Sequence, residues 1–193
     1  MKKIEALQIL QKTNKRIFNT PDLKKLFGIE NRNTINKQIS GLIKAGVLSR
    51  IMKGFYYLTN DKPLDFELAN ILYGPSYISL YSALNFYGIL IQTPQEITSV
   101  SSKLTSTATH DGKIFSYAHL DRKYFTNYQL VDNFLIATPE KALVDMMFFV
   151  SLGKGSLSVE ELDLSLVNKR KVKALASAIK NKAFKKYFKS VNL

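Results

Sequence analysis

Hydrophobic residues recur every three or four positions in two stretches of the first 45 residues. These stretches run over 4–10 and 35–43, and each predicts a helix with one buried face. Between them, Thr20 and Pro21 suit the start of a short helix, and Gly28 suits its end. The pattern therefore predicts three helices, the third of which spans residues 31–45.

After the third helix, the pattern changes to short runs of β-branched and aromatic residues. Residues 47–51 and 55–58 predict two strands, joined by a turn at Met52-Lys53-Gly54. A helix, a short helix, a turn, a longer helix and a hairpin follow one another in winged helix-turn-helix domains, which bind DNA. We therefore predict such a domain over residues 1–60.

The outward side of the third helix carries no acidic residue. Amide side chains pair with adenine edges, arginine forks onto guanine, and lysine and hydroxyl groups hold phosphates. The predicted DNA-binding residues lie on this side and in the hairpin: Arg32, Asn33, Thr34, Asn36, Lys37, Ser40, Lys44, Arg50 and Lys53. The alternative is a small α+β domain whose polar helix face is only solvated.

A polar stretch over 59–65 marks the boundary to a second domain over residues 66–193. The pattern there predicts helices over 66–72 and 77–88, a strand over 96–102, a hairpin at Asp111-Gly112, and a strand that runs into a helix over 135–145. We therefore predict an α+β chain. A winged helix-turn-helix domain precedes a mixed α/β domain that ends in a basic C-terminal helix.

The charge of the chain is distributed unevenly along the sequence. The 193 residues carry a net charge of +13. Residues 1–60 carry +9, residues 61–150 carry −3, and residues 151–193 carry +7. Basic ends favour a polyanionic partner such as double-stranded DNA, and the alternative is a general use of lysine for solubility.

The composition excludes several classes of protein. With no cysteine and only two histidines, the chain has no disulfide and no thiol nucleophile, and we expect neither a metal site nor a cofactor. No apolar run approaches the ~20 residues that cross a bilayer, and the N-terminal segment lacks the pattern of a signal peptide. We expect a cytoplasmic protein that does not contact membranes.

An enzyme is the rival hypothesis. Glu96, Lys103 and Asp111 gather in one strand-like region, as in a metal-dependent nuclease, but Glu96 and Lys103 stand seven positions apart instead of at the usual close spacing. The sequence also has no glycine-rich phosphate loop and no Ser-His-Asp arrangement. We therefore expect a protein that is not an enzyme. A nuclease, and a stand-alone winged-helix regulator with a ligand-binding second domain, stay open as alternatives.

Two motifs of the second domain resemble a known family. The pattern Tyr-Ile-Ser-Leu-x-Ser-Ala-Leu-x-x-Tyr-Gly spans Tyr77 to Gly88, and Ala-Thr-Pro-Glu-Lys-Ala-Leu-x-Asp spans Ala137 to Asp145. Together with the predicted winged helix in front of them, these motifs resemble the AbiEi antitoxin family of bacterial abortive-infection systems. The resemblance covers most of the chain.

This resemblance implies a transcriptional repressor of its own operon that also counters a nucleotidyltransferase toxin. The first domain would bind DNA, and the second would act as the antitoxin without a stable antitoxin–toxin complex. We expect the operator to be double-stranded DNA with inverted repeats in the chain's own promoter. We expect a monomer in solution and two copies on that DNA.

The motif residues have two interpretations. Most of them are typical of a core or of helix caps, as Ser79 and Thr138 are. The aromatic and charged ones are candidates for an exposed antitoxin surface: Tyr77, Tyr81, Tyr87, Glu140, Lys141 and Asp145.

The end of the chain is strongly basic. From Lys169 to Lys189, apolar residues recur every three or four positions among lysines, which predicts one amphipathic helix. This helix either packs on the second domain with its lysines in water or adds a secondary contact to a nucleic-acid backbone. The candidates for that contact are Lys180, Lys182, Lys185 and Lys186.

Overall fold

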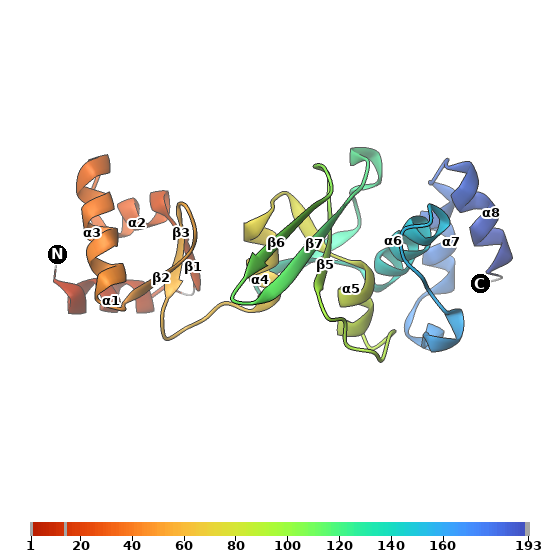
Figure 1. Cartoon of the computed structure of the whole chain (residues 1–193), viewed down its shortest axis with the longest axis horizontal. Helices are drawn as coiled ribbons and strands as arrows, with labels where there is room; N and C mark the ends of the chain where they lie inside the picture. The colour runs from red at the N-terminus through yellow and green to blue at the C-terminus, as the bar shows by residue number, and fades with distance from the viewer. Residues whose placement is uncertain (1, 14, 192–193) are drawn as a thin grey trace. The chain divides into compact units, whose positions relative to one another are not determined.

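Helices and strands alternate irregularly along the chain, which gives it an α+β fold (Figure 1). The structure is a computed structural model that describes residues 2–13 and 15–191. The chain divides into two compact units, Met1–Leu72 and Tyr73–Leu193. No helix in the described part of the chain is long and apolar enough to cross a membrane.

Four helices and a small sheet form the first unit. Its elements are α1 (Lys3–Gln11), β1 (Ile17–Asn19), α2 (Thr20–Phe27), α3 (Arg32–Lys44), β2 (Leu48–Met52), β3 (Phe55–Leu58) and α4 (Asp65–Leu72). The three strands pair antiparallel in the order β1-β3-β2. The predicted three helices and hairpin are confirmed, and β1 was not predicted. The core of this unit contains Ala6, Leu10, Phe18, Leu23, Ile35, Ile39, Leu42, Leu48, Tyr56 and Leu58.

Local side-chain contacts fix the ends of α2. Asn19, and not Thr20 as the sequence suggests, caps the helix: its side chain accepts from the Asp22 N–H at 2.7 Å, and the Asp22 carboxylate accepts from the Asn19 N–H at 3.2 Å. Gly28 ends α2 in the left-handed region at φ 63°, where a residue without Cβ is unstrained. The chain then turns sharply into α3.

The first unit extends beyond the predicted boundary at 59–65. The side chain of Glu67 on α4 is buried, accepts from the Leu64 N–H at 2.7 Å and pairs with Arg16 at 3.6 Å. Helix α4 also contacts β2. These contacts attach α4 to the first unit, so the second unit starts at Tyr73 instead of at residue 66.

A six-stranded mixed sheet organises the second unit. Its strands are β4 (Ser76–Ile78), β5 (Ile97–Ser101), β6 (Ser106–His110), β7 (Lys113–His119), β8 (Tyr128–Val131) and β9 (Phe134–Ala137), in the order β6-β7-β5-β4-β9-β8. The pairs β4–β9 and β5–β7 are parallel, and the other pairs are antiparallel. The predicted Asp111-Gly112 turn joins β6 to β7.

The helix predicted over 77–88 begins later than its pattern suggests. Tyr77 pairs with Val100 of β5, and Ile78 pairs with Ile136 of β9, so both residues belong to β4 near the middle of the sheet. Helix α5 spans Leu80–Phe86. Tertiary strand pairing therefore overrides the local helical pattern at the first motif.

The remaining helices of this unit gather around α6 (Pro139–Ser151). Thr138 caps α6 as predicted, and ten consecutive residues of the helix, from Glu140 to Phe149, are buried. Helix α6 contacts α5, α7 (Lys169–Ser177) and α8 (Lys182–Ser190). Short 3-10 turns lie at Arg122–Tyr124, Val159–Glu161 and Leu164–Leu166.

The basic C-terminal helix predicted from Lys169 to Lys189 is two helices. Helix α7 ends at Ser177, and Asn181 starts α8 by accepting from the Phe184 N–H at 3.1 Å. Ile179, between the helices, is buried together with Phe184. The asparagine cap and the buried isoleucine therefore break a pattern whose period alone predicts one helix.

Candidate nucleic-acid interface

An asparagine cap and a buried apolar stripe fix the position of α3. The Asn31 side chain accepts from the Asn33 and Thr34 N–H groups at 2.9 and 3.1 Å, which satisfies the first turn of the helix. Ile35, Ile39 and Leu42 are at most 1% exposed, because they form the stripe that packs into the core. The opposite side of α3 is thereby turned to solvent.

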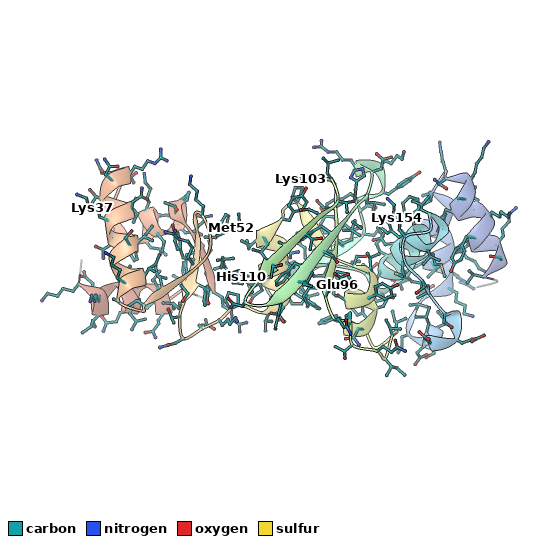
Figure 2. All side chains as sticks on the ribbon, in the orientation of Figure 1. Lys37, Met52, Glu96, Lys103, His110 and Lys154 are labelled. Carbon is teal, nitrogen blue, oxygen red and sulfur yellow. The ribbon has the colours of Figure 1, made fainter. Side chains whose placement is uncertain are left out.

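All seven α3 residues predicted to bind DNA are exposed: Arg32, Asn33, Thr34, Asn36, Lys37, Ser40 and Lys44. Asn33, Lys37, Ser40 and Lys44 follow one another at spacings of three and four, so they form a line along the helix. Figure 2 shows Lys37 on the side of α3 that faces away from the sheet of the same unit. A helix of 13 residues is about 20 Å long, and a major groove about 12 Å wide admits such a helix.

The β2–β3 hairpin carries the other two predicted contacts. Arg50 is exposed on β2, with its guanidinium carbon 5.7 Å from the centre of the Tyr56 ring, and Lys53 is exposed in the turn. The Gly54 carbonyl next to Lys53 accepts from the Thr20 N–H at 3.0 Å. This backbone hydrogen bond ties the turn of the hairpin to the start of α2, so the hairpin is held in place.

The predicted antitoxin surface does not form as an exposed surface. Tyr77, Glu140, Lys141 and Asp145 are 0, 8, 4 and 1% exposed, and that part of the prediction is wrong. The Glu140 carboxylate accepts from the Asn168 N–H at 3.3 Å, at the start of α7. Burial follows from the position of α6, which is covered by three other helices.

The other two tyrosines of that set are half-buried and bonded to the backbone. The Tyr81 hydroxyl donates to the Ser156 carbonyl at 2.6 Å, and the Tyr87 hydroxyl donates to the Ala137 carbonyl at 2.8 Å. Burial raises the pKa of Tyr87. Both hydroxyls hold neighbouring segments of the second unit together.

Asp145 is the centre of a buried polar cluster. Its Oδ2 accepts from the hydroxyls of Tyr77 and Ser79, each at 2.9 Å, and its Oδ1 accepts from the Lys141 ammonium. Burial raises the pKa of Asp145, and the nearby Lys141 charge partly opposes that shift. Burial and the Asp145 charge raise the pKa of Tyr77 well above its ordinary value.

This cluster links β4 to α6, and it is closed to solvent. Ser79 occupies the N-cap position of α5 as predicted, but its hydroxyl donates to Asp145 and makes no capping hydrogen bond to the helix. The ring of Tyr77 stacks on Tyr128 with centroids 5.0 Å apart. Buried groups with satisfied hydrogen bonds and no access are typical of a structural role.

The tail lysines proposed for a secondary contact are all exposed, but they do not belong to one helix. Lys182, Lys185 and Lys186 lie on α8, and Lys180 lies in the loop before it. Lys182 and Lys186 are one helical turn apart, so they share a side of α8.

The residues considered for a nuclease are not brought together. Figure 2 shows Glu96 and Lys103 at opposite ends of β5. The His119 ring contacts the Lys103 carbonyl at 2.8 Å. Among residues 2–13 and 15–191, the structure contains no group of three or more His, Cys, Asp or Glu that could hold a metal ion.

Three structural residues were missed in the sequence. Asn31 and Asn181 cap helices, and an asparagine just before an apolar period is the signal for such a cap. Phe184 is 1% exposed, and its place one helical turn before Phe188 on α8 is the local signal that could have indicated its burial. Compared with known proteins, the chain matches no family model and no curated protein. Its function is therefore inferred from its own residues.

Proposed function

We propose that the first unit is a winged helix-turn-helix domain that binds double-stranded DNA as a transcriptional regulator. In this proposal, α2 and α3 form the helix-turn-helix, α3 is the recognition helix, and the β2–β3 hairpin is the wing. The observation that carries the proposal is the exposed side of α3, where amide, hydroxyl and cationic side chains gather without one acidic residue. A helix of this kind enters the major groove in helix-turn-helix complexes.

Each exposed side chain has a role that its chemistry supports. Arg32, Asn33 and Asn36 near the start of α3 suit base edges, since recognition helices contact bases mainly with their N-terminal residues. Lys37, Thr34, Ser40 and Lys44 suit the phosphates on either side of the groove. Arg50 and Lys53 suit the phosphate backbone or the adjacent minor groove, as contacts from the wing.

A merely solvated helix face is less consistent with this charge pattern. Solvated faces of helices usually mix both signs, because acid–base pairs three or four positions apart stabilise them. All charged side chains on the exposed side of α3 are cations, and residues 1–60 carry a net charge of +9. That excess attracts a polyanion and raises its rate of association.

We also propose, from the resemblance of the two motifs, that the chain represses its own operon and counters a nucleotidyltransferase toxin. The first unit would bind inverted repeats as two copies, and the second unit would supply the antitoxin activity without a stable complex with the toxin. Because four of the six candidate antitoxin residues are buried, that activity would use other residues of the second unit.

The DNA-binding proposal is tested by fluorescence anisotropy with a labelled duplex from upstream of the chain's own gene. Arg32→Ala with Lys37→Ala removes two exposed cations from α3, and we expect at least roughly tenfold weaker binding, since one lost base contact costs about 1–3 kcal/mol. The control is Lys3→Ala with Lys12→Ala, which removes the same charge from the exposed side of the first helix region. Equal weakening by both pairs would show that α3 has no special role.

The antitoxin proposal is tested by growth of cells that express the neighbouring nucleotidyltransferase gene. We expect the intact chain to restore growth. We expect the Arg32→Ala, Lys37→Ala variant to restore it as well, because its second unit is unchanged. A variant that folds but no longer restores growth would place part of the antitoxin activity in the first unit.

A further inference from the structure

A groove lies between the last two helices of the second unit. It has a volume of about 500 Å³. Its apolar part includes Ala176 of α7 and the rings of Phe184 and Phe188 of α8, whose centroids are 5.7 Å apart. Four lysines also line it: Lys173, Lys185, Lys186 and Lys189. We call these four residues the lysine rim.

The lysine rim has no acidic complement nearby in the sequence. From Lys169 to Lys189 the chain carries nine cations and no acidic residue. All four rim lysines are exposed, and none forms an ion pair within the part of the chain that the structure describes. The groove therefore presents apolar surface and positive charge together, and each needs a complement from another molecule.

The groove is lined by residues of two short helices. Helices α7 and α8 both pack against α6, and each has nine residues, which gives a length of about 13 Å. A partner helix with apolar residues at positions i, i+3, i+4 and i+7 fills such a groove between two helices. Carboxylates on both flanks of that helix would then face the lysine rim.

We propose that the α7–α8 groove binds an acidic amphipathic helix of a partner protein. The apolar side of the partner helix packs over the part of the Phe188 ring that is open to solvent and over the aliphatic stems of the rim lysines, and its glutamates or aspartates pair with the ammonium groups of those lysines. This interaction is separate from the proposed DNA binding, because the groove lies entirely in the second unit.

The lining favours a peptide over a nucleic acid. Single-stranded nucleic acids bind through bases that stack on open aromatic faces. The Phe184 ring is 1% exposed and already packs against Phe148 at 6.0 Å and Phe188 at 5.7 Å. Duplex DNA would meet the lysines but has no apolar group that fills the floor of the groove.

The test uses the full chain and a synthetic, fluorescein-labelled peptide of about 16 residues, or four to five helical turns. Leucines occupy one side of the peptide helix and glutamates occupy both flanks. The control peptide has the same composition in scrambled order, so it keeps the charge and loses the apolar side. We expect the patterned peptide to bind roughly tenfold more tightly in fluorescence anisotropy.

Variants then locate the binding site. Lys185→Gln with Lys189→Gln removes two rim charges, and we expect roughly fivefold weaker binding of the patterned peptide. Lys171→Gln with Lys180→Gln removes the same charge from one exposed position of α7 and one exposed position of the loop before α8, neither of which lines the groove, and we expect less than about twofold change. Both pairs are exposed, so thermal melting should match the unsubstituted chain.

Three outcomes would overturn the proposal. Equal binding of the patterned and scrambled peptides would show that only charge matters. Equal weakening by the two lysine pairs would show that the groove is not the site. Tight binding of a single-stranded oligonucleotide that is lost in the Lys185→Gln, Lys189→Gln variant, with no binding of the patterned peptide, would assign the groove to nucleic acid.

Discussion

Removal of the Asp145 carboxylate tests the buried cluster that joins β4 to α6. Asp145→Ala leaves the Lys141 ammonium, which is 4% exposed, without a counter-charge, and it leaves the Tyr77 and Ser79 hydroxyls without their acceptor. Removal of one partner of a buried ion pair costs about 3–5 kcal/mol, and each buried hydroxyl left without an acceptor adds about 1–3 kcal/mol. We expect the free energy of unfolding to fall by about 4 kcal/mol or more.

Lys141→Met should cost less, and its cost should depend on pH. Asp145 keeps both hydroxyl donors in this variant, and loss of the Lys141 charge raises the pKa of Asp145 further. At pH values between the ordinary pKa of 3.8 and the raised pKa of the folded state, Asp145 binds a proton in the folded state and has lost it in the unfolded state. The variant should therefore regain stability as the pH falls through the folded pKa, by at most about 1.4 kcal/mol per pH unit.

Urea unfolding of the full chain, followed by circular dichroism at neutral and mildly acidic pH, measures both effects. The control is Asp121→Ala, which removes a carboxylate from an exposed ion pair with Lys123 and should leave the unfolding midpoint unchanged. Asp145→Leu with Lys141→Met removes both buried charges and should be more stable than Asp145→Ala alone. A loss below about 1 kcal/mol for Asp145→Ala, or a double variant that is less stable than Asp145→Ala, would contradict a stabilising role of Asp145 opposite the buried Lys141 charge.

Three further predictions concern single positions. Lys53→Ala should weaken binding to all duplex sequences alike and flatten the slope of log K against log[salt] by roughly 0.9, as measured by anisotropy; a selective effect on one sequence would contradict a phosphate contact. Gly41→Ala should raise the free energy of unfolding by about 0.5–1 kcal/mol in thermal melts, because an added Cβ meets no atom within 4 Å, whereas Gly28→Ala should lower it at φ 63°. Burial raises the pKa of Tyr117 above its ordinary value of 10.0, so at high pH the folded state keeps a proton that the unfolded state releases. The free energy of unfolding should therefore fall as the pH rises above that value, and over this pH range the urea midpoint of Tyr117→Phe should fall less than that of the unsubstituted chain.

Elements with short-range signals could be predicted from the sequence. Helix α3 combines a regular apolar stripe at Ile35, Ile39 and Leu42 with a following glycine, and the start of α6 combines Thr138 with Pro139. Each of these signals acts over a few residues, so no knowledge of distant contacts is needed. For the same reason, the exposed side of α3 could be deduced once its buried stripe was identified.

Elements that depend on distant partners could not be predicted. Tyr77 and Ile78 fit a helical pattern, but pairing with Val100 and Ile136 places them in a strand. The hydrogen bond between Tyr77 and Asp145 joins residues 68 positions apart, and no local pattern encodes it. Glu140, Lys141 and Asp145 were misplaced for the same reason, because the burial of α6 depends on helices from three other segments.

The two sequence motifs over Tyr77 to Gly88 and Ala137 to Asp145 consist largely of interior residues. Ser79 of the first motif and Lys141 of the second both donate to Asp145, and Glu140 accepts from the Asn168 N–H at the start of α7. These motif residues join the end of β4 to α6, and α6 to the start of α7. A substitution at one of these buried residues disturbs the core, whereas a substitution on the surface around them leaves the core intact. In the proposals above, recognition is assigned instead to exposed cationic side chains of α3, α7 and α8, which can be substituted without any change in the core.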